Sequence, residues 1–328
     1  INNYSMHMLK KLLIYMPAFN EEETISNVIN SLKQKDFNYF EQIEILVVND
    51  GSTDKTVEEA KKNGATVISH MKNKGVGEAF QTAIKYAIKS NADILVSMDA
   101  DGQFDVNEID LLLEPLLSEK ADFCLGIRFS DGKPDKMSNI KFWGNKQVNK
   151  IVSFVSNTKI QDASCGFRAY SRDTLLSLNL DGSFTYTHET ILDLLNKGFK
   201  VEQVPITVFY FDNRISRVAN SLILYATKTS VIIFKSLKDY KPLQFFLSIA
   251  LFIFLISLFF GGWALIHWII NDTLTPYKSF GIIGISLLGM SLLVTIFSFL
   301  ADMLGRIRRN QEKILYFLKQ THFEDPKK

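Results

Sequence analysis

Short apolar runs alternate with stretches of helical spacing through the first 211 residues. Five of these runs have the length and composition of buried strands, at residues 12–16, 43–48, 66–69, 94–98 and 123–126. Between them, apolar residues recur at helical intervals, as in Ile25, Val28, Ile29 and Leu32. The alternation predicts an α/β fold with a mostly parallel sheet flanked by helices. An open sheet of this kind binds its ligands at the carboxyl ends of its strands.

Two much longer apolar runs follow. Residues 242–271 and 279–301 contain no Asp, Glu, Lys or Arg, and only Asp272 and Lys278 are charged between them. A helix needs roughly 20 residues to cross the hydrocarbon core of a membrane, and each run is long enough. The pattern predicts two transmembrane helices, and the alternative is a pair of buried helices in a soluble core.

Basic residues are concentrated on both sides of this apolar pair. Residues 214–241 carry six basic side chains and one acidic, and residues 302–328 carry seven and four. By the positive-inside rule, both flanks face the cytoplasm. The expected organisation is a cytoplasmic domain at 1–213, an interfacial helix at 214–241, two transmembrane helices with a short non-cytoplasmic loop at 242–301, and a cytoplasmic helical tail at 302–328.

The expected interfacial helix is amphipathic. Leu222, Ala226, Ile233 and Leu237 fall on one face of a helix at 218–241. Such a helix can lie on membrane lipids, which its basic excess favours, or pack on the soluble domain. The sequence leaves open whether the membrane helices also associate into a homo-oligomer.

The composition excludes several other classes of protein. The 328 residues include 37 Lys and Arg against 35 Asp and Glu, so the net charge of +2 does not suit a nucleic-acid-binding protein. With 47% hydrophobic residues, the chain has the composition of a folded protein and not of a disordered one. Cys124 and Cys165 are isolated, which excludes a cysteine-based zinc site.

The polar segment after the fourth predicted strand carries the clearest candidate chemistry. Asp99 and Asp101 are two residues apart on extended chain, so both carboxylates project to the same side, and a turn at Gly102 brings Gln103 close. Oxygen ligands in this arrangement suit Mg²⁺ or Mn²⁺ shared with a diphosphate. The alternative is a solvated turn before the next helix.

The segments after the first two strands are less specific by themselves. Asn20 followed by three glutamates is typical of a capped helix start. Asp50 can accept hydrogen bonds from ribose hydroxyls or a base, or it can belong to an ordinary turn.

Taken together, these segments resemble a known family. The motifs are MPAFNEE (16–22), VVNDGSTDKT (47–56), MDADGQ (98–103), QDASCGFRAYSRD (161–173) and THETILDLLNKGFKVEQVPI (187–206). In this order, over about residues 10–211, they resemble the family 2 glycosyltransferases, which have the nucleotide-sugar-binding fold called GT-A. The chain is most similar to the polyprenyl-phosphate glycosyltransferases, the group that contains dolichyl-phosphate mannose synthase.

The resemblance implies a role for particular residues on the donor side. Those expected to line the nucleoside pocket are Pro17, Phe19, Glu21, Val48 and Asp50. Asp99 and Ala100 would contact the nucleotide sugar, and Asp101 and Gln103, with Asp99, would hold the divalent metal.

Basic residues would surround the two phosphate groups. Arg128 matches an arginine of the family near the phosphates of donor and acceptor, and Arg217 matches a basic residue that closes over the diphosphate. Arg214 competes with Arg217, because Ile215 stands where the family has glycine.

On the acceptor side, the resemblance points to two further residues. Arg168 would grip a lipid phosphate, and Asp162 would orient the acceptor or take a proton. The alternative is a turn capped by Asp162 with Arg168 in a surface pair. Glu189 is the second choice for the base.

The resemblance implies a membrane-bound, metal-dependent and inverting transferase. It would move a sugar from a UDP- or GDP-linked donor to polyprenyl phosphate, such as undecaprenyl or dolichyl phosphate. Because that phosphate is already anionic, no strong base is needed. The alternatives are an enzyme acting on a glycolipid or polysaccharide acceptor, or an inactive lipid-binding scaffold.

Overall fold

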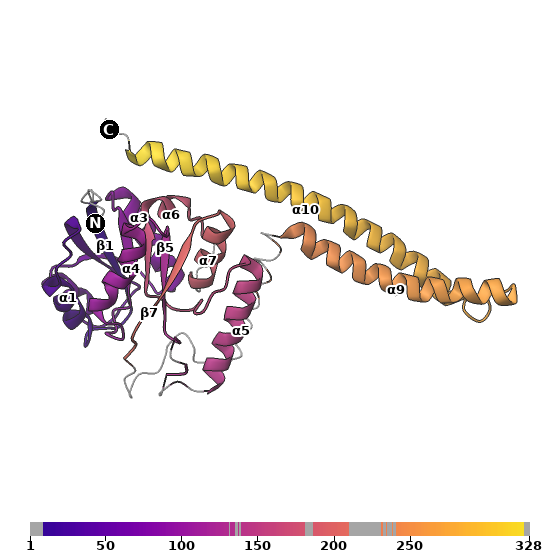
Figure 1. Ribbon diagram of the computed structural model, residues 1–328, viewed down its shortest axis with the longest axis horizontal. Coiled ribbons are helices and arrows are strands. Elements are labelled where there is room, and N and C mark those ends of the chain that lie inside the picture. Colours follow the sequence, from indigo (N-terminus) through magenta and orange to yellow (C-terminus); the bar gives the residue numbers. More distant parts are fainter. Residues whose placement is uncertain are drawn as a thin grey trace, which may run out of the picture. The chain divides into compact units, whose positions relative to one another are not determined.

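A seven-stranded sheet forms the centre of the α/β region, with helices on both faces (Figure 1). The strand order is β3-β2-β1-β4-β6-β5-β7, and only β6 runs antiparallel to its neighbours β4 and β5. The strands are β1 (Leu9–Ala18), β2 (Phe40–Asn49), β3 (Thr66–Ser69), β4 (Ile94–Ser97), β5 (Phe123–Ile127), β6 (Arg168–Ser171) and β7 (Val201–Pro205). All five predicted strands occur in this mostly parallel sheet; β6 and β7 are additional.

The helices of this region lie between the strands in sequence. They are α1 (Ile25–Gln34), α2 (Thr56–Lys62), α3 (Val76–Lys89), the short 3-10 helix η1 (Val106–Glu108), α4 (Ile109–Leu117), α5 (Asn139–Ser156), α6 (Arg172–Ser177) and α7 (Thr187–Asn196). This computed structural model describes residues 9–130, 132–134, 137, 139–180, 186–209, 231, 234, 238 and 241–324. Most of the expected interfacial helix at 214–241 therefore lies outside the described residues, as do Arg214 and Arg217.

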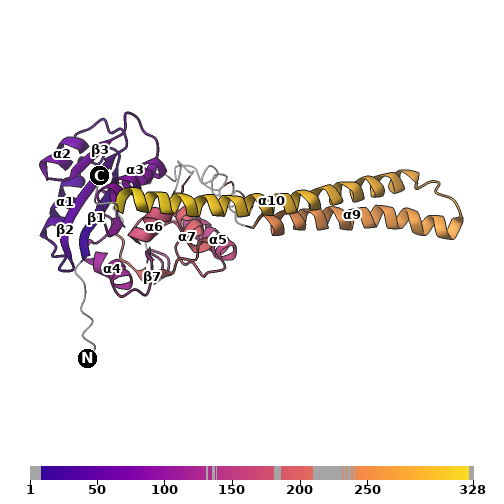
Figure 2. The ribbon, with the colours of Figure 1, turned by 90° about the horizontal axis from the view of Figure 1, so that it is seen from above.

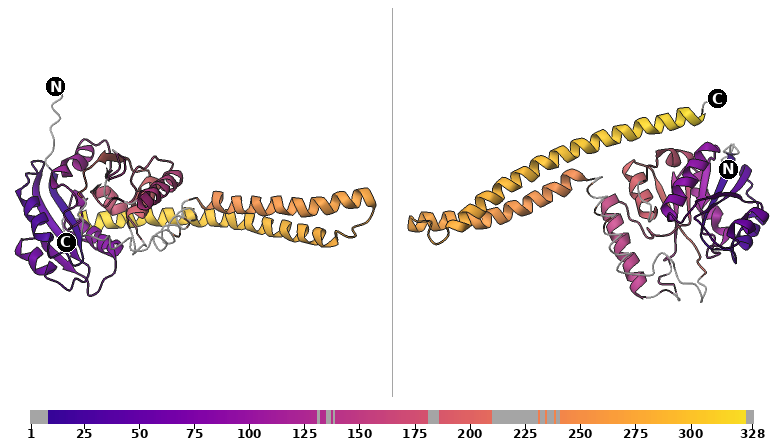
Figure 3. Two further views of the ribbon diagram at one scale, coloured as in Figure 1. Left: turned by 90° about the horizontal axis from the view of Figure 1, so that it is seen from below. Right: turned by 180° about the vertical axis from the view of Figure 1, so that it is seen from behind.

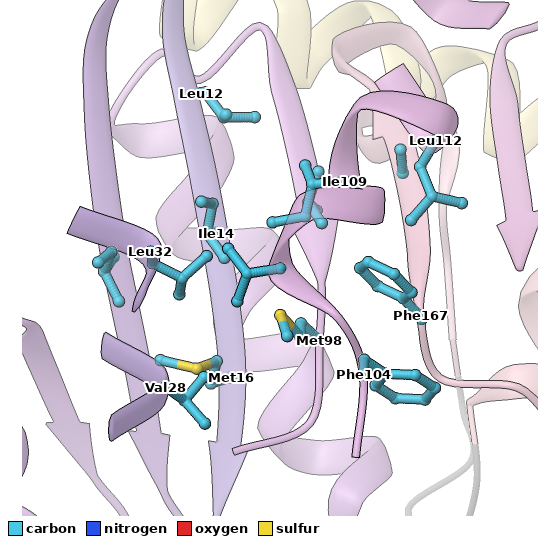
Figure 4. Packing of buried hydrophobic residues seen from close by; sticks show 14 of the residues in the cluster. Leu12, Ile14, Met16, Val28, Leu32, Met98, Phe104, Ile109, Leu112 and Phe167 are labelled. Carbon is cyan, nitrogen blue, oxygen red and sulfur yellow. The ribbon is translucent and has the colours of Figure 1, made fainter. Parts of the chain in front are cut away.

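The two faces of the sheet bury different sets of side chains. Because side chains alternate along a strand, Leu12, Ile14 and Met16 of β1 share one face, where they join a cluster with α1 and α4 (Figure 4). On the opposite face, Tyr15 packs near Phe80 of α3, with ring centroids 5.9 Å apart. Both faces of the sheet are therefore covered by packed side chains.

The C-terminal part contains two long helices, α9 (Pro242–Asn271) and α10 (Lys278–Glu324), which pack antiparallel (Figure 2). Both are long and apolar enough to cross a membrane, which makes them candidate membrane spans. Their interface uses small and hydroxyl residues: Ser257 donates to the carbonyl of Gly284 (2.8 Å), and Ser291 donates to that of Ala250 (2.9 Å).

The expected tail is not a separate element. Residues 302–324 continue α10 without a break, which Figure 3 shows from two further sides. The chain divides into two compact units, and residues from Leu315 onward belong to the unit of the sheet, whereas residues 233–314 form the other. In the stretch from Leu315 onward, Lys319 donates hydrogen bonds from Nζ to the carbonyls of Leu176 and Leu178, each at 3.1 Å. Lys319 thereby satisfies acceptors at the end of α6.

Candidate active site

The carboxyl ends of β1, β2 and β4 meet at one edge of the sheet. The three strands are parallel neighbours, with Ala18 paired to Asn49 and Tyr15 paired to Ser97. The polar segments that follow the three strands are thereby brought together, as the sequence predicts. Of the expected nucleoside-pocket residues, Val48 is a buried strand residue, and Pro17 and Phe19 are half-buried at this edge.

Hydrogen bonds join the first two segments. The amide of Asn20 donates to Ser52 Oγ (3.0 Å), and its side-chain oxygen accepts from the amide of Thr53 (2.9 Å). Glu21 donates from its amide to Thr56 Oγ1 (2.8 Å). Asn20 has a φ of 55°, and α1 begins five residues later, so Asn20 links two loops and does not cap the helix as expected.

Asp50 anchors a third loop. Its side chain is buried, and its carboxylate accepts hydrogen bonds from the amides of Lys74 (2.9 Å) and Gly75 (2.8 Å). His70 Nδ1 lies 2.8 Å from Asp50 Oδ1, and His70 Nε2 lies 3.0 Å from Thr82 Oγ1. Asp50 therefore shapes the edge of the expected nucleoside pocket by ordering the loop before α3.

Asp99 and Asp101 follow β4 and lie near each other. Burial and the charge of Asp101 raise the pKa of Asp99 to about 7, against the opposing effect of Arg128. Burial also raises the pKa of Asp101, although its Oδ1 accepts a hydrogen bond from the amide of Gln103 (3.0 Å). The raised pKa values mean that the two carboxylates resist being ionised at the same time. A cation bound between them would stabilise their ionised forms. Ala100 is buried between them and accepts at its carbonyl from Thr24 Oγ1 (2.9 Å).

These residues fit a divalent cation that is shared with a ligand. The donor set is two carboxylates and the amide oxygen of Gln103, and Mg²⁺ usually takes one or two carboxylates together with waters and phosphate oxygens. Within the described parts of the chain, no group of three or more His, Cys, Asp or Glu side chains could enclose an ion by itself. A cavity of about 510 Å³ borders Asp101 and Gly102 and extends along the polar side of α1, past Asn27 and Ser31.

Arg128 and Asp162 form an ion pair at the end of β5. Arg128 donates from Nε to Asp162 Oδ2 (2.8 Å) and from Nη2 to Oδ1 (2.9 Å), and Nη2 also reaches Ser164 Oγ (2.8 Å). The Asp162 carboxylate is fully buried, whereas 18% of the Arg128 side chain is exposed. Asp162 is thus placed to hold Arg128; the role expected from the sequence was to orient the acceptor or take a proton.

Arg168 also lies elsewhere than expected. Its side chain is fully buried, and it does not face a surface where it could grip a lipid phosphate. The guanidinium donates to the carbonyls of Ala163 (2.9 Å), Cys165 (2.7 Å) and Thr187 (2.7 Å), and to Thr190 Oγ1 (2.9 Å). Arg168 therefore fastens the 161–167 loop to the start of α7.

The first turn of α7 contains Glu189 and His188. Glu189 is half-buried. His188 is buried, and burial together with the charge of Arg168 lowers its pKa to about 4. Neither ring nitrogen of His188 has a hydrogen-bond partner among the residues described by the structure.

Three residues near the site are missing from the sequence-based predictions. His70 is the first residue after the strand at 66–69, so its position at the ligand edge could have been predicted. Gly166 lies against Asp99, and Tyr186 bonds to Ser97 through its hydroxyl (2.8 Å). Both of these contacts depend on how distant loops fold together, which no local pattern reveals.

Comparisons with known proteins identify the family of the chain. The model of the family "Glycosyl transferase family 2" matches residues 13–177. A dolichyl-phosphate N-acetylglucosaminyltransferase of Methanococcus voltae that uses UDP-N-acetylglucosamine is 31% identical over 65% of this chain and 92% of its own length. Glycosyltransferase AglJ of Haloferax volcanii is 26% identical over 92% of this chain and 95% of its own length.

A solved structure shares the fold. Glucosyl-3-phosphoglycerate synthase of Mycobacterium tuberculosis, crystallised with UDP, aligns with a TM-score of 0.55 over 70% of this chain and 79% of its own length, at 22% identity. The alignment identifies the fold of the α/β region as GT-A-like.

Proposed function

Since the chain belongs to glycosyl transferase family 2, we propose that it moves a sugar from a UDP- or GDP-linked donor to polyprenyl phosphate. The observation that carries the proposal is the carboxylate pair Asp99 and Asp101 at the shared edge of three parallel strands. Such a pair suits a nucleoside diphosphate with its cation. A relative named for transfer to dolichyl phosphate, and two apolar helices after the α/β region, support a lipid acceptor.

The reaction we propose is a single displacement. An oxygen of the lipid phosphate attacks the anomeric carbon, the bond to the nucleoside diphosphate breaks, and the configuration at that carbon inverts. The phosphate is already anionic near neutral pH, so no side chain has to remove a proton. Asp162 can therefore remain paired with Arg128, and Glu189 is not required as a base.

The departing diphosphate needs positive charge. Mg²⁺ or Mn²⁺, when bound by Asp101 with Asp99 and Gln103, supplies part of it. Arg128 supplies another part in this proposal, since Asp162 and Ser164 hold its guanidinium in one orientation while part of the side chain reaches the surface. Arg217, which lies outside the described residues, would close over the same group.

The membrane orientation is part of the proposal. Lys241 precedes α9, and Arg306, Arg308 and Arg309 follow the apolar part of α10. Because the two helices are antiparallel, these basic residues lie at the same end of the pair. By the positive-inside rule, that end and the catalytic domain face the cytoplasm.

The test is transfer of labelled sugar into organic-extractable lipid by the purified protein in detergent. The assay combines a short polyprenyl phosphate, Mn²⁺ or Mg²⁺, and a panel of UDP- and GDP-sugars. We expect labelling from one donor that requires the metal and falls at least 100-fold in Asp101→Asn. The matched control is Asp110→Asn, which removes a carboxylate that is 55% exposed and paired with Lys35.

Two other outcomes would replace this proposal. If nucleotide binds but no donor labels the lipid, a glycolipid or polysaccharide acceptor becomes the better hypothesis. If nucleotide does not bind either, the chain is better explained as a lipid-binding scaffold. Analysis of the product's anomeric configuration tests the displacement, because retention of configuration would require two steps.

A further inference from the structure

Gly166 lies directly against the carboxylate of Asp99. A β-carbon at position 166 would be 3.3 Å from Asp99 Oδ1 and 3.5 Å from Oδ2, and 3.7 Å from the Tyr186 hydroxyl. The first of these distances is tighter than ordinary van der Waals contact between such atoms. Gly166 is not among the glycines with positive φ, so its backbone would accept alanine. Position 166 therefore needs glycine because a side chain there would crowd the Asp99 carboxylate, and not because of its backbone conformation.

The backbone on both sides of Gly166 is held in place. Before it, the carbonyls of Ala163 and Cys165 accept hydrogen bonds from the buried guanidinium of Arg168. After it, the carbonyl of Phe167 accepts from the amide of Gly126 in β5 (3.0 Å). A side chain added at 166 therefore cannot be accommodated by withdrawal of the loop.

Tyr186, which also lies beside Asp99, is held as firmly as the backbone around Gly166. The Tyr186 ring stacks on Phe80 with centroids 4.0 Å apart, and its hydroxyl bonds to Ser97 Oγ two residues before Asp99. Tyr186 and Ser97 are both buried. The Asp99 carboxylate itself accepts no hydrogen bond from any described residue, so its position is set by the shape of this pocket.

We infer that Gly166 is a positioning residue for Asp99. The bare backbone at 166 fixes where the Asp99 carboxylate lies, so the 161–167 loop shapes the donor side of the site. The inference rests on the proposed function, in which Asp99 contacts the nucleotide sugar. It assigns to Gly166 an effect on donor binding that acts only through Asp99.

The test is Gly166→Ala, with Gly144→Ala in α5 as the matched control. The control adds the same β-carbon where nothing lies within 4 Å. Calorimetry measures the affinity for the nucleotide sugar in Mn²⁺, and kinetics separate the donor KM from the acceptor KM. We expect Gly166→Ala to weaken donor binding about tenfold with the acceptor KM unchanged, and Gly144→Ala to change neither.

A double-mutant cycle with Asp99→Asn distinguishes positioning from general damage. If Gly166 acts through Asp99, then Gly166→Ala adds less than a twofold loss in the Asp99→Asn background. Equal losses in both backgrounds would overturn the inference, as would unchanged donor affinity in Gly166→Ala. In a further outcome, the wild type transfers no sugar to lipid while the variants show the expected donor affinities. That result would count against the proposed function alone. No binding of any nucleotide sugar by the wild type would overturn both.

Discussion

The α/β region and the α9–α10 pair place apolar side chains in opposite ways. In the α/β region, the apolar side chains of Phe167 and Leu12 are fully buried. In the helix pair, Ile285 is 74% exposed, whereas Ser298 at the helix contact is fully buried. Water drives the first arrangement, because it favours burial of apolar surface. The second is typical of helices surrounded by lipid, which gives no such driving force.

The largest effect should come from truncating a core side chain in the α/β region. Phe167→Ala removes a ring that is fully buried and stacks on Phe104 at 5.0 Å, so we expect a loss of about 3–5 kcal/mol in the free energy of unfolding. Ile285→Ala removes an exposed apolar side chain from α10 and should cost less than about 0.5 kcal/mol in detergent. Thermal unfolding of both variants measures the difference. Similar losses would show that the exposed surface of α10 packs against protein and not lipid.

A pH effect should be confined to the α/β region. His188 has a pKa of about 4 in the folded protein and near 6.5 when unfolded, so the unfolded chain binds more protons between these values. Stability should therefore fall as pH drops from 6.5 toward 4, by up to about 3 kcal/mol for this group. The measurement compares unfolding of the wild type and His188→Gln at pH 7.5 and 4.5. If both lose the same amount, His188 is not responsible.

The contrast between Asp50 and Arg168 shows what the sequence could predict. The strand at 43–48 ends in the uninterrupted apolar run 45–48, so its end, and with it Asp50, could be placed at the ligand edge. Arg168 begins β6, a four-residue strand with an arginine and a serine that has no apolar pattern. Its burial depends on carbonyls of a loop and of α7, whose positions come from tertiary packing. The family resemblance made Arg168 a candidate but did not indicate the direction of its side chain.

The same limit applies to the C-terminal helices. Their apolar character is plain in the sequence because 30 successive residues lack charge. The sequence does not indicate that α10 continues beyond residue 301, because the composition changes there from apolar to basic. A helix can continue across such a change because its backbone hydrogen bonds are internal, whatever surrounds its side chains.

Close packing between α9 and α10 provides a sharper test of the helix pair. A β-carbon at Gly284 would lie 2.5 Å from the Gly261 Cα, whereas one at Gly289 would meet nothing within 4 Å. We expect Gly284→Val to destabilise the pair by about 1–3 kcal/mol through overpacking, and Gly289→Val to have no such cost. Both changes alter helix propensity alike, so the difference isolates the contact. Fluorescence of Trp263 and Trp268 in a Trp143→Phe background reports unfolding of α9; equal midpoints would contradict the packing.

The smallest effect should appear where the end of α10 joins the α/β region. Lys319 is partly buried, and burial together with nearby Lys197 lowers its pKa. Lys319→Met keeps much of the aliphatic stem but removes the bonds to Leu176 and Leu178, so we expect a loss of about 1 kcal/mol. Tyr316→Phe, which removes one exposed bond to Asp173, should cost less still. Hydrogen exchange at α6 measures the docking directly: faster exchange in Lys319→Met than in Tyr316→Phe is expected, because the lysine satisfies carbonyls at the end of that helix. Unchanged exchange in both variants would mean that α6 keeps its end structure without α10.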